Sequence, residues 1–356
     1  MIKVKILFRA AVTVLSLVLF SCNPVEKFYT SGDFEEVAKT DAHFHYLTYN
    51  EEYLKFAKEL NFRLVSPNWD GEYSIDEQMK ITSKVLLSNP ENLAFLGTFS
   101  LADYGKPVFT SKTIERIKEC INAGASGIKI WKNIGMALKD SSGNYVMVDN
   151  PAFDSIFMYL EENNIPVLAH LGEPKDCWLP LEEMTDPGDK AYYKNNPEYY
   201  MYLDPDAPSY EDQIIARDNI LKKYPNLNFV GAHLASLEWS VDEIAKRLDD
   251  YPNLRVDLAA RLYHLQYQSK IDRDKVRNFM IKYQDRILYA TDFEVHDIEG
   301  KDSREVMENL RKSWLSQWIY LATDSITSVQ GLQLPKEVID KIYYKNADLY
   351  FNRNNY

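Results

Sequence analysis

The sequence predicts an α/β protein that folds as a single (β/α)8 barrel. Three observations lead to this prediction. Short apolar runs recur along the chain, helix-like segments lie between them, and no change of composition divides the chain. Regular alternation of strand and helix patterns is typical of a parallel sheet whose strands are joined by crossover helices. A doubly wound open sheet is the alternative architecture.

Eight apolar runs have the length of strands. They cover residues 37–44, 62–66, 93–99, 127–131, 165–171, 227–232, 254–258 and 287–290. The helical patterns between them cover residues 74–88, 111–123, 152–163, 211–224, 240–249 and 273–283, and further helical patterns continue towards the C-terminus. Eight strand-then-helix units are the number that closes a TIM-type barrel, so we expect one barrel domain over residues 37–352.

The connection after the fifth predicted strand, residues 172–210, is unusually long. Its aromatic side chains are Trp178, Tyr192, Tyr193, Tyr199, Tyr200 and Tyr202. Loops of this length inside compact domains are commonly lids or binding loops. The alternative is a surface excursion that is packed by its own aromatic side chains.

The N-terminus has the pattern of a secretory signal. Lysines and an arginine precede an apolar run over residues 10–20, which a serine and Cys22 follow; this run is too short to span a bilayer. Residues 19–22 resemble the lipobox of bacterial lipoproteins. The resemblance implies a signal peptide over 1–21, a lipidated Cys22 as membrane anchor in the cell envelope, and a tether over 22–36. An ordinary cleaved signal with a chance cysteine is the alternative.

Charge and cysteine content limit the function classes. The formal net charge is −12, and the predicted signal is basic, so the mature chain is more acidic still and poorly suited to nucleic acid. No glycine loop of the phosphate-binding kind is present, so we expect no nucleotide cofactor. Cys120 and Cys177 are placed at opposite ends of the predicted barrel, and we therefore expect no disulfide between them.

Histidines and an aspartate end the predicted strands. His43 and His45, two residues apart at the end of the first strand, are expected to project from one face into the barrel mouth. His170 ends the fifth strand, His233 the sixth and Asp292 the eighth. Barrel enzymes keep their active sites at this end of the strands, and imidazoles with a carboxylate suit zinc or manganese.

With these motifs, and with residues 341–347, the chain resembles the amidohydrolase superfamily, and more narrowly its amidohydrolase-2 branch. The resemblance implies that a divalent ion is held by His43, His45, His170 and Asp292. It also implies that His233 acts on the substrate or as an acid or base, and that Asp292 takes a proton from water activated by the metal.

Lys129 ends the fourth predicted strand, where some superfamily members carry a carboxylated lysine that bridges two metals. If Lys129 is modified in this way, it would bridge two metals, and His170 and His233 would bind the second. We favour one metal, with Lys129 as a cation near the substrate. Lys132 is a weaker candidate for the same role.

Other polar residues follow the predicted strands. Arg261 should reach the mouth and could grip a substrate carboxylate, or it could pair with a loop acid. Glu173 and Trp178 are candidate pocket walls, together with Lys175. We expect His264 and His296, in later loops, to be ordinary surface histidines.

The sequence therefore predicts a metal-dependent hydrolase that acts on an ester, lactone or amide bond of a small, carboxylated molecule. The alternatives are non-oxidative decarboxylation or hydration on the same barrel, and ligand capture by a lipid-anchored binding protein without turnover. The oligomeric state is left open.

Overall fold

The computed structural model describes residues 27–296 and 302–351. Its strands are β1 Lys39–Asp41, β2 Phe44–Leu47, β3 Phe62–Pro67, β4 Leu93–Leu96, β5 Ile128–Ile130, β6 Val167–Ala169, β7 Phe229–Gly231, β8 Leu254–Asp257, β9 Ile287–Leu288 and β10 Phe293–His296. The longer helices are α1 Glu52–Glu59, α2 Ile75–Ser88, α3 Phe109–Asn122, α5 Asp154–Glu162, α6 Pro187–Asn195, α7 Tyr210–Lys223, α9 Val241–Asp250, α10 Leu262–Lys282 and α11 Ser303–Ala322. The shorter helices are α4 Asn133–Met136, α8 Ala232–Ala235, α12 Lys336–Asp340 and α13 Asn346–Phe351.

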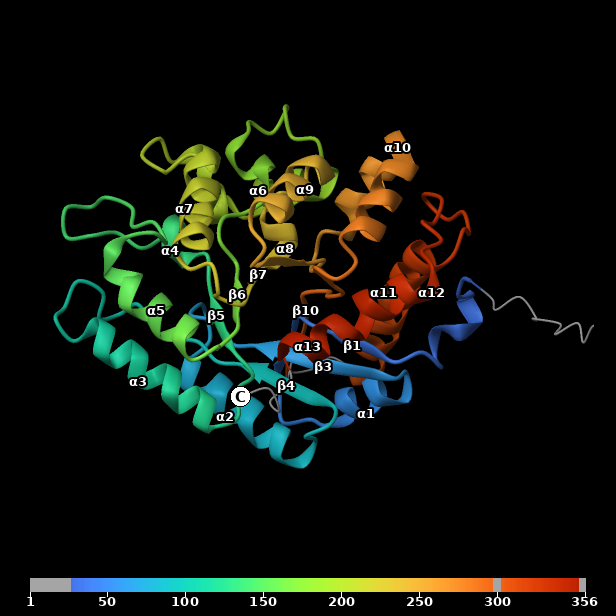
Figure 1. Cartoon of the computed structure of the whole chain (residues 1–356), viewed down its shortest axis with the longest axis horizontal. Coiled ribbons are helices and arrows are strands. Elements are labelled where there is room, and N and C mark those ends of the chain that lie inside the picture. Colours follow the sequence, from blue (N-terminus) through green and yellow to red (C-terminus); the bar gives the residue numbers. More distant parts are fainter. Residues whose placement is uncertain (1–26, 297–301, 352–356) are drawn as a thin grey trace, which may run out of the picture.

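All strand pairs in these ranges are parallel, and helices alternate with strands along the chain (Figure 1). The pairing orders are β1-β3-β4, β5-β6-β7-β8-β9 and β10-β2. Gly97, after β4, bridges Ile128 of β5, and the N–H of Ala42 donates to the carbonyl of Tyr289 after β9 at 3.0 Å. These two links connect the β1-β3-β4 sheet to the five-stranded sheet, one next to β5 and the other just after β9. The α/β class is confirmed, and the arrangement is consistent with the predicted (β/α)8 barrel.

The interior of the strand layer is filled by small and branched side chains. This cluster contains Ala42, Val65, Ala94, Leu96, Leu168, Val230, Ala232, Ala259, Leu288 and Ala290, and it also takes in Ala347 and Phe351 of α13. A separate, larger cluster packs the helices on the outside of the strands. Two concentric cores of this kind are typical of barrels, and they hold the strand ends, which carry the polar residues, in fixed positions.

The first predicted strand is divided in the structure. β1 ends at Asp41 and β2 begins at Phe44. Between them, the carbonyl of His43 accepts a hydrogen bond from the N–H of Asp292 at 2.8 Å, and β2 then pairs with β10 instead of β3. The bend arises because the chain bonds here to a segment about 250 residues away, which no local pattern reveals.

Helix α10 begins eleven residues earlier than the pattern at residue 273 predicts. A break at Asp272 (φ −148°, ψ 90°) divides α10, and the Asp272 side chain accepts a hydrogen bond from the N–H of Lys275 at 3.0 Å. This is the signal of a helix start. The true first turn, after Arg261, has no side-chain cap, so the sequence offers no start signal there.

The expected tether over residues 22–36 differs from the structure where the two overlap. Phe28 forms an antiparallel bridge with Pro335, and the hydroxyl of Tyr29 donates to Asp340 at 2.9 Å. Phe34 is buried in the main core. Residues 27–36 are therefore part of the folded body. Apolar contacts of Tyr29 and Phe34 with Trp318, rather than any periodicity, hold this segment in place. The predicted signal peptide, Cys22 and residues 23–26 lie outside the described residues.

The connection over residues 172–210 folds as α6 with short 3-10 turns around it. It has a small apolar cluster of its own, made of Cys177, Met184, Tyr193, Tyr200 and Met201. We call this segment the insertion. Cys120 and Cys177 are both buried free thiols, as expected. No helix within the described ranges combines the length and apolar character needed to cross a membrane.

Candidate metal centre

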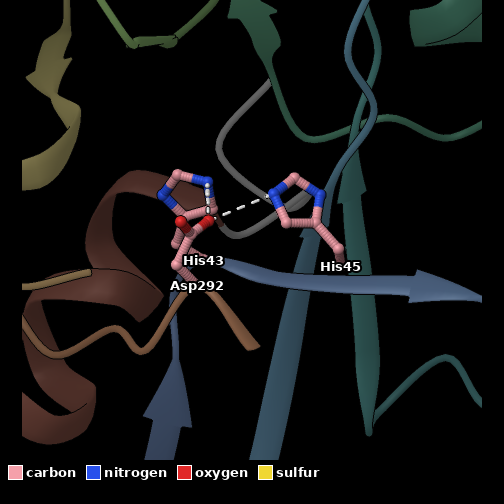
Figure 2. Close-up of side chains that lie close together, drawn as sticks. All are labelled: His43, His45 and Asp292. Atoms are coloured by element: carbon pink, nitrogen blue, oxygen red, sulfur yellow. Dashed lines mark ion pairs between the residues drawn. The ribbon is translucent and has the colours of Figure 1, made fainter. Parts of the chain in front are cut away.

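His43, His45 and Asp292 converge at the carboxyl end of the barrel strands. Figure 2 shows the three side chains pointing toward one another from the β1–β2 bend, from β2 and from the segment after β9. The Nε2 atoms of both histidines lie 3.2 Å from Oδ1 of Asp292. One ligand atom from each residue lies within 4.8 Å of the others. This is the donor set and spacing of a divalent metal site.

The outer nitrogen of each histidine is bound to the protein. Nδ1 of His43 lies 2.9 Å from Oδ2 of Asp257, and Nδ1 of His45 lies 2.9 Å from the carbonyl oxygen of Pro67. Because a carbonyl oxygen only accepts, Nδ1 of His45 carries the hydrogen and Nε2 presents a lone pair. Such outer contacts fix the tautomer and the ring orientation of metal-binding histidines.

Asp257, at the end of β8, is a functional residue that the sequence reasoning missed. It is fully buried, and its Oδ1 accepts hydrogen bonds from the N–H groups of His233 at 2.6 Å and Ala259 at 3.1 Å. Burial raises its pKa. One carboxylate thus positions both His43 and His233. Its place at a strand end was the signal that could have identified it.

Asp41, at the end of β1, positions the opposite side of the site. Its carboxylate accepts hydrogen bonds from the hydroxyl of Thr291 at 2.6 Å and from Nε1 of Trp314 at 3.0 Å. Burial raises the pKa of Asp41 to about 7. The neighbouring Asp292 has a positive φ of 65°, a conformation that costs energy for a residue other than glycine and persists only where the surroundings enforce it.

His233 begins a turn in which residues 233–236 all have positive φ values between 56° and 59°. Its backbone N–H is bound to Asp257, and its Nδ1 lies 2.9 Å from the carbonyl oxygen of Ala259. Nε2 of His233 is buried without a hydrogen-bond partner, 4.0 Å from Oδ2 of Asp292. The strained turn therefore aims this nitrogen at Asp292.

His170, after β6, lies beside His233, with ring centroids 4.1 Å apart, and is not part of the close group of three. Its Nε2 is also buried without a hydrogen-bond partner. Buried nitrogens without partners are costly unless a ligand satisfies them. The unpaired Nε2 atoms of His170 and His233, next to the group of three, fit a site that takes a divalent ion.

The surroundings of these side chains favour the protonation states in which they can bind a metal. Burial lowers the pKa of His233 to about 3, and it lowers the pKa values of His43 and His170 well below the usual range. Burial alone would raise the pKa of Asp292, but His43 and His233 hold it well below its usual value. His43, His170 and His233 are thus neutral imidazoles beside the ionised carboxylate of Asp292.

Lys129, in β5, is buried with its Nζ 3.1 Å from Nε2 of His43. Burial lowers the pKa of Lys129 to about 8. The predicted position beside the centre agrees with the structure. Both roles considered for Lys129, a cation near the substrate and a carboxylated bridge, require this position.

A pocket of about 640 Å³ opens next to the centre. Its lining includes His170, His233 and Asp292 from the centre, Lys132 and Arg261 as cations, and Glu173, Asp189, Tyr192 and Tyr193 from the insertion. Glu173 forms ion pairs with Lys132 and, at 3.6 Å, with Nη2 of Arg261. Arg261 therefore pairs with a loop acid, and it also faces the pocket.

The comparisons with known proteins address the family. A family model described as Amidohydrolase matches residues 101–351. The chain belongs to the amidohydrolase family. The matched range includes His170, His233 and Asp292, whereas His43 and His45 lie before it.

Solved structures resemble this amidohydrolase in fold. An uncharacterised TIM-barrel protein of Bordetella bronchiseptica aligns with a TM-score of 0.54 at 16% identity, over 90% of this chain and 100% of that one. A 2,6-dihydroxybenzoate decarboxylase from Rhizobium aligns with a TM-score of 0.52 at 15% identity, over 89% of this chain and 99% of that one. The search of curated proteins returned no match. The family match supports a metal-dependent enzyme of the amidohydrolase superfamily, and the solved structures support the fold alone.

Three expectations for the amidohydrolase need correction. Trp178 does not line the pocket, because its Nε1 donates to the carbonyl of Pro208 at 2.9 Å and its ring packs on Tyr210. His264 is buried, with Nε2 3.1 Å from Oδ2 of Asp189, because α10 begins before it. His296 lies in β10 rather than in a loop, with Nδ1 2.9 Å from Oε1 of Glu294.

Proposed function

We propose that this amidohydrolase is a metal-dependent hydrolase that acts on an ester, lactone or amide bond of a small, carboxylated molecule. The observation that carries the proposal is that the two carboxylate oxygens of Asp292 contact different residues. Oδ1 contacts the Nε2 atoms of His43 and His45, whereas Oδ2 is directed at His233 on the pocket side. One oxygen can hold an ion while the other accepts a proton from a water molecule in the pocket.

His43, His45 and Asp292, joined by His170, would hold one divalent ion, for which we propose zinc, with manganese as the alternative. Such an ion would polarise the scissile carbonyl and make a water molecule acidic enough to attack at neutral pH. The chain's own residues supply the rest. Asp292 receives the proton of the attacking water and passes it to the leaving group. Nε2 of His233 presents a lone pair, because Nδ1 donates to the carbonyl of Ala259, and it accepts a hydrogen bond from the substrate or the water.

Two cations on the far wall of the pocket are the reason for proposing a carboxylated substrate. Arg261 is almost fully buried, and its Nε has no hydrogen-bond partner. A guanidinium in this state gains a strong, directed interaction from a substrate carboxylate. Lys132 lies on the same wall, with Glu173 between the two cations. We therefore place a carboxylate of the substrate against Arg261 and its reacting carbonyl beside Asp292.

Non-oxidative decarboxylation or hydration is the second candidate. The cations on the pocket wall favour it, because they would also hold the carboxylate of an aromatic or unsaturated acid, and a fold neighbour is described as 2,6-dihydroxybenzoate decarboxylase. A lipid-anchored binding protein without turnover is the third candidate. Consumption of substrate separates it from both enzymes.

Product analysis tests the proposal. Purified protein loaded with zinc, and separately with manganese, is incubated with a panel of lactones, esters, amides and aromatic or unsaturated acids. Hydrolysis that is lost in Asp292→Asn and retained in the matched surface variant Asp274→Asn supports the proposal. Release of carbon dioxide, or addition of water to a double bond, with no acyl-bond cleavage assigns the second candidate instead.

We also propose that Cys22 is lipidated and holds the enzyme at a membrane of the cell envelope. The supporting observation is the lipobox-like sequence of residues 19–22, which lies five positions or more before Lys27, the first residue that the structure describes.

A further inference from the structure

An exposed apolar patch lies at the edge of the molecule where the described chain begins. Ile326 is 79% exposed and Ile271 is 76% exposed, and Tyr267, one turn before Ile271 on α10, is 47% exposed. Isoleucine is among the residues most often buried, and here two that are more than three-quarters exposed lie on neighbouring segments. We call Tyr267, Ile271 and Ile326 the edge patch.

Hydrogen bonds hold the two parts of the edge patch together. Ile326 lies in a hairpin over residues 325–331, in which the N–H of Gly331 donates to the carbonyl of Ser325 at 3.0 Å. The carbonyl of Gly331 in turn accepts a hydrogen bond from Nε of Arg273 at 2.8 Å. Arg273 is two residues after Ile271. The hairpin is therefore fastened to α10 two residues after Ile271, just beyond the break at Asp272.

The same hairpin leads directly to the first described residues. The chain that leaves Gly331 reaches Pro335, which bridges Phe28, and the N–H of Lys336 donates to the carbonyl of Lys27 at 3.0 Å. In Figure 1 the N-terminal segment (blue), α12 and the hairpin (red) and the end of α10 (orange) lie toward the same side of the molecule. Lys27 and the edge patch thus belong to one edge.

The length of chain before Lys27 determines what can cover this edge. A polypeptide advances at most about 3.6 Å per residue, so Cys22 reaches no farther than about 18 Å from Lys27. A lipid on Cys22 would bring the bilayer within that distance of the folded body. The edge that carries Lys27 would therefore lie near the membrane whenever the anchor is inserted.

We propose that the edge patch lies against the bilayer, with the side chains of Ile271 and Ile326 inserted at the headgroup level, so that the barrel is docked on the membrane by its α10–α12 edge. The inference rests on the lipid anchor proposed above. Apolar side chains presented beside an anchor add a second membrane contact.

Docking through the edge patch would also fix the position of the pocket relative to the bilayer. Tyr263, Tyr267 and Ile271 are spaced at i, i+4 and i+8 before the break in α10, so they follow one face of the helix. Tyr263 lines the pocket at the other end of that face. The pocket wall and the bilayer contact are therefore two ends of one helical stripe about 12 Å long.

Site-specific fluorescence in vesicles tests the proposal. Ile326→Cys, Ile271→Cys and the control Leu87→Cys, an 84% exposed leucine on α2, are each labelled with an environment-sensitive dye in the lipidated full chain. The chain's own Cys120 and Cys177 are buried. Vesicles that contain lipids with a spin-labelled headgroup region act as quencher. We expect roughly twofold or stronger quenching at residues 326 and 271 relative to 87, because interfacial apolar side chains insert among the headgroups.

Three results overturn the proposal in distinguishable ways. Failure of the chain to float with vesicles removes the anchor and the docking together. Flotation with equal quenching at 326, 271 and 87 leaves the anchor intact and shows that the body has no preferred face. Shielding of the label at 326 in a concentration-dependent dimer, without vesicles, assigns the edge patch to a second copy of the chain.

Discussion

Oδ2 of Asp257 lies 2.9 Å from Nδ1 of His43, while Oδ1 of the same carboxylate holds the backbone N–H of His233. The buried carboxylate of Asp257 thus orients the imidazole of His43. It also holds the backbone of His233 at the start of the strained turn that directs the His233 side chain toward Asp292. Asp257 touches neither the proposed ion nor the pocket. Its effect on chemistry must pass through His43 and His233, and Asp257 is therefore a positioning residue.

Replacing Asp257 by Asn should weaken metal binding by roughly 10–100-fold, because outer contacts of histidine ligands contribute about that much to affinity. The amide retains an oxygen for the backbone N–H groups, so we expect the protein to fold. Competition titration with a chromophoric chelator measures the affinity, and circular dichroism checks the fold. Unchanged affinity in a folded variant would show that Asp257 has a structural role only.

Removing both first-strand histidines, His43→Ala with His45→Ala, should deprive the purified protein of most of its divalent metal. Elemental analysis of the purified protein measures this. His296→Ala is the matched control, since His296 lies in β10, outside the group of three, and metal content should be unchanged there. Full occupancy in a folded double variant would place the ion elsewhere.

Lys129→Ala separates a one-metal from a two-metal centre. With one metal, as we propose, metal content stays near one per chain while turnover falls, since Lys129 then acts on substrate charge. With a carboxylated bridge, metal content falls from about two to about one or less. Expression with added bicarbonate and metal is needed, so that incomplete carboxylation does not imitate the first result. Two metals in the wild type and a metal-poor variant would contradict our choice.

Cys22→Ala should leave the protein uncleaved or released from the membrane, because the lipidated cysteine is the proposed anchor. Fractionation of cells into soluble and membrane parts, with mass measurement of the mature N-terminus, detects both outcomes. Normal processing with unchanged, detergent-dependent membrane association would remove the lipoprotein proposal.

Lys39 should make stability depend on pH in a defined window. Burial lowers its pKa from 10.5 to about 7 in the folded protein. Between these values the unfolded chain binds a proton that the folded chain releases, so wild-type stability should fall as pH falls from about 10 to about 7. Lys39→Met should flatten this dependence in urea titrations, whereas the exposed Lys80→Met should not. Parallel pH profiles for Lys39→Met and wild type would contradict the assignment.

Local patterns predicted the elements that local interactions form. The α/β class and the strands that end just before His170 and His233 follow from short apolar runs and the residues after them, although His233 itself lies in a turn beyond the end of β7. The β1–β2 bend does not, because its cause is pairing with residues near Asp292 at the far end of the chain. His43 and His45 converge on Asp292 as expected, although a bend, rather than the alternation of one strand, brings them together.

The residues that position the site were harder to predict than the ligands. Asp41 and Asp257 are each the last residue of a strand, and their roles depend on partners such as Thr291 and His43 that are distant in sequence. The sequence did not reveal the early start of α10 for a different reason. The capping aspartate, Asp272, lies at the internal break of the helix, so the pattern predicts a start there and not at Leu262.

The insertion carries its own apolar cluster, separate from those of the barrel. Side chains that face the pocket from α6 can therefore change without repacking the strands that hold His43, His45 and Asp292. The proposed metal chemistry thus depends on the strand ends, whereas the proposed substrate preference depends on the insertion together with Lys132 and Arg261. An exchange of residues 172–210 between relatives would be expected to alter the preference for a substrate while the metal chemistry stays the same.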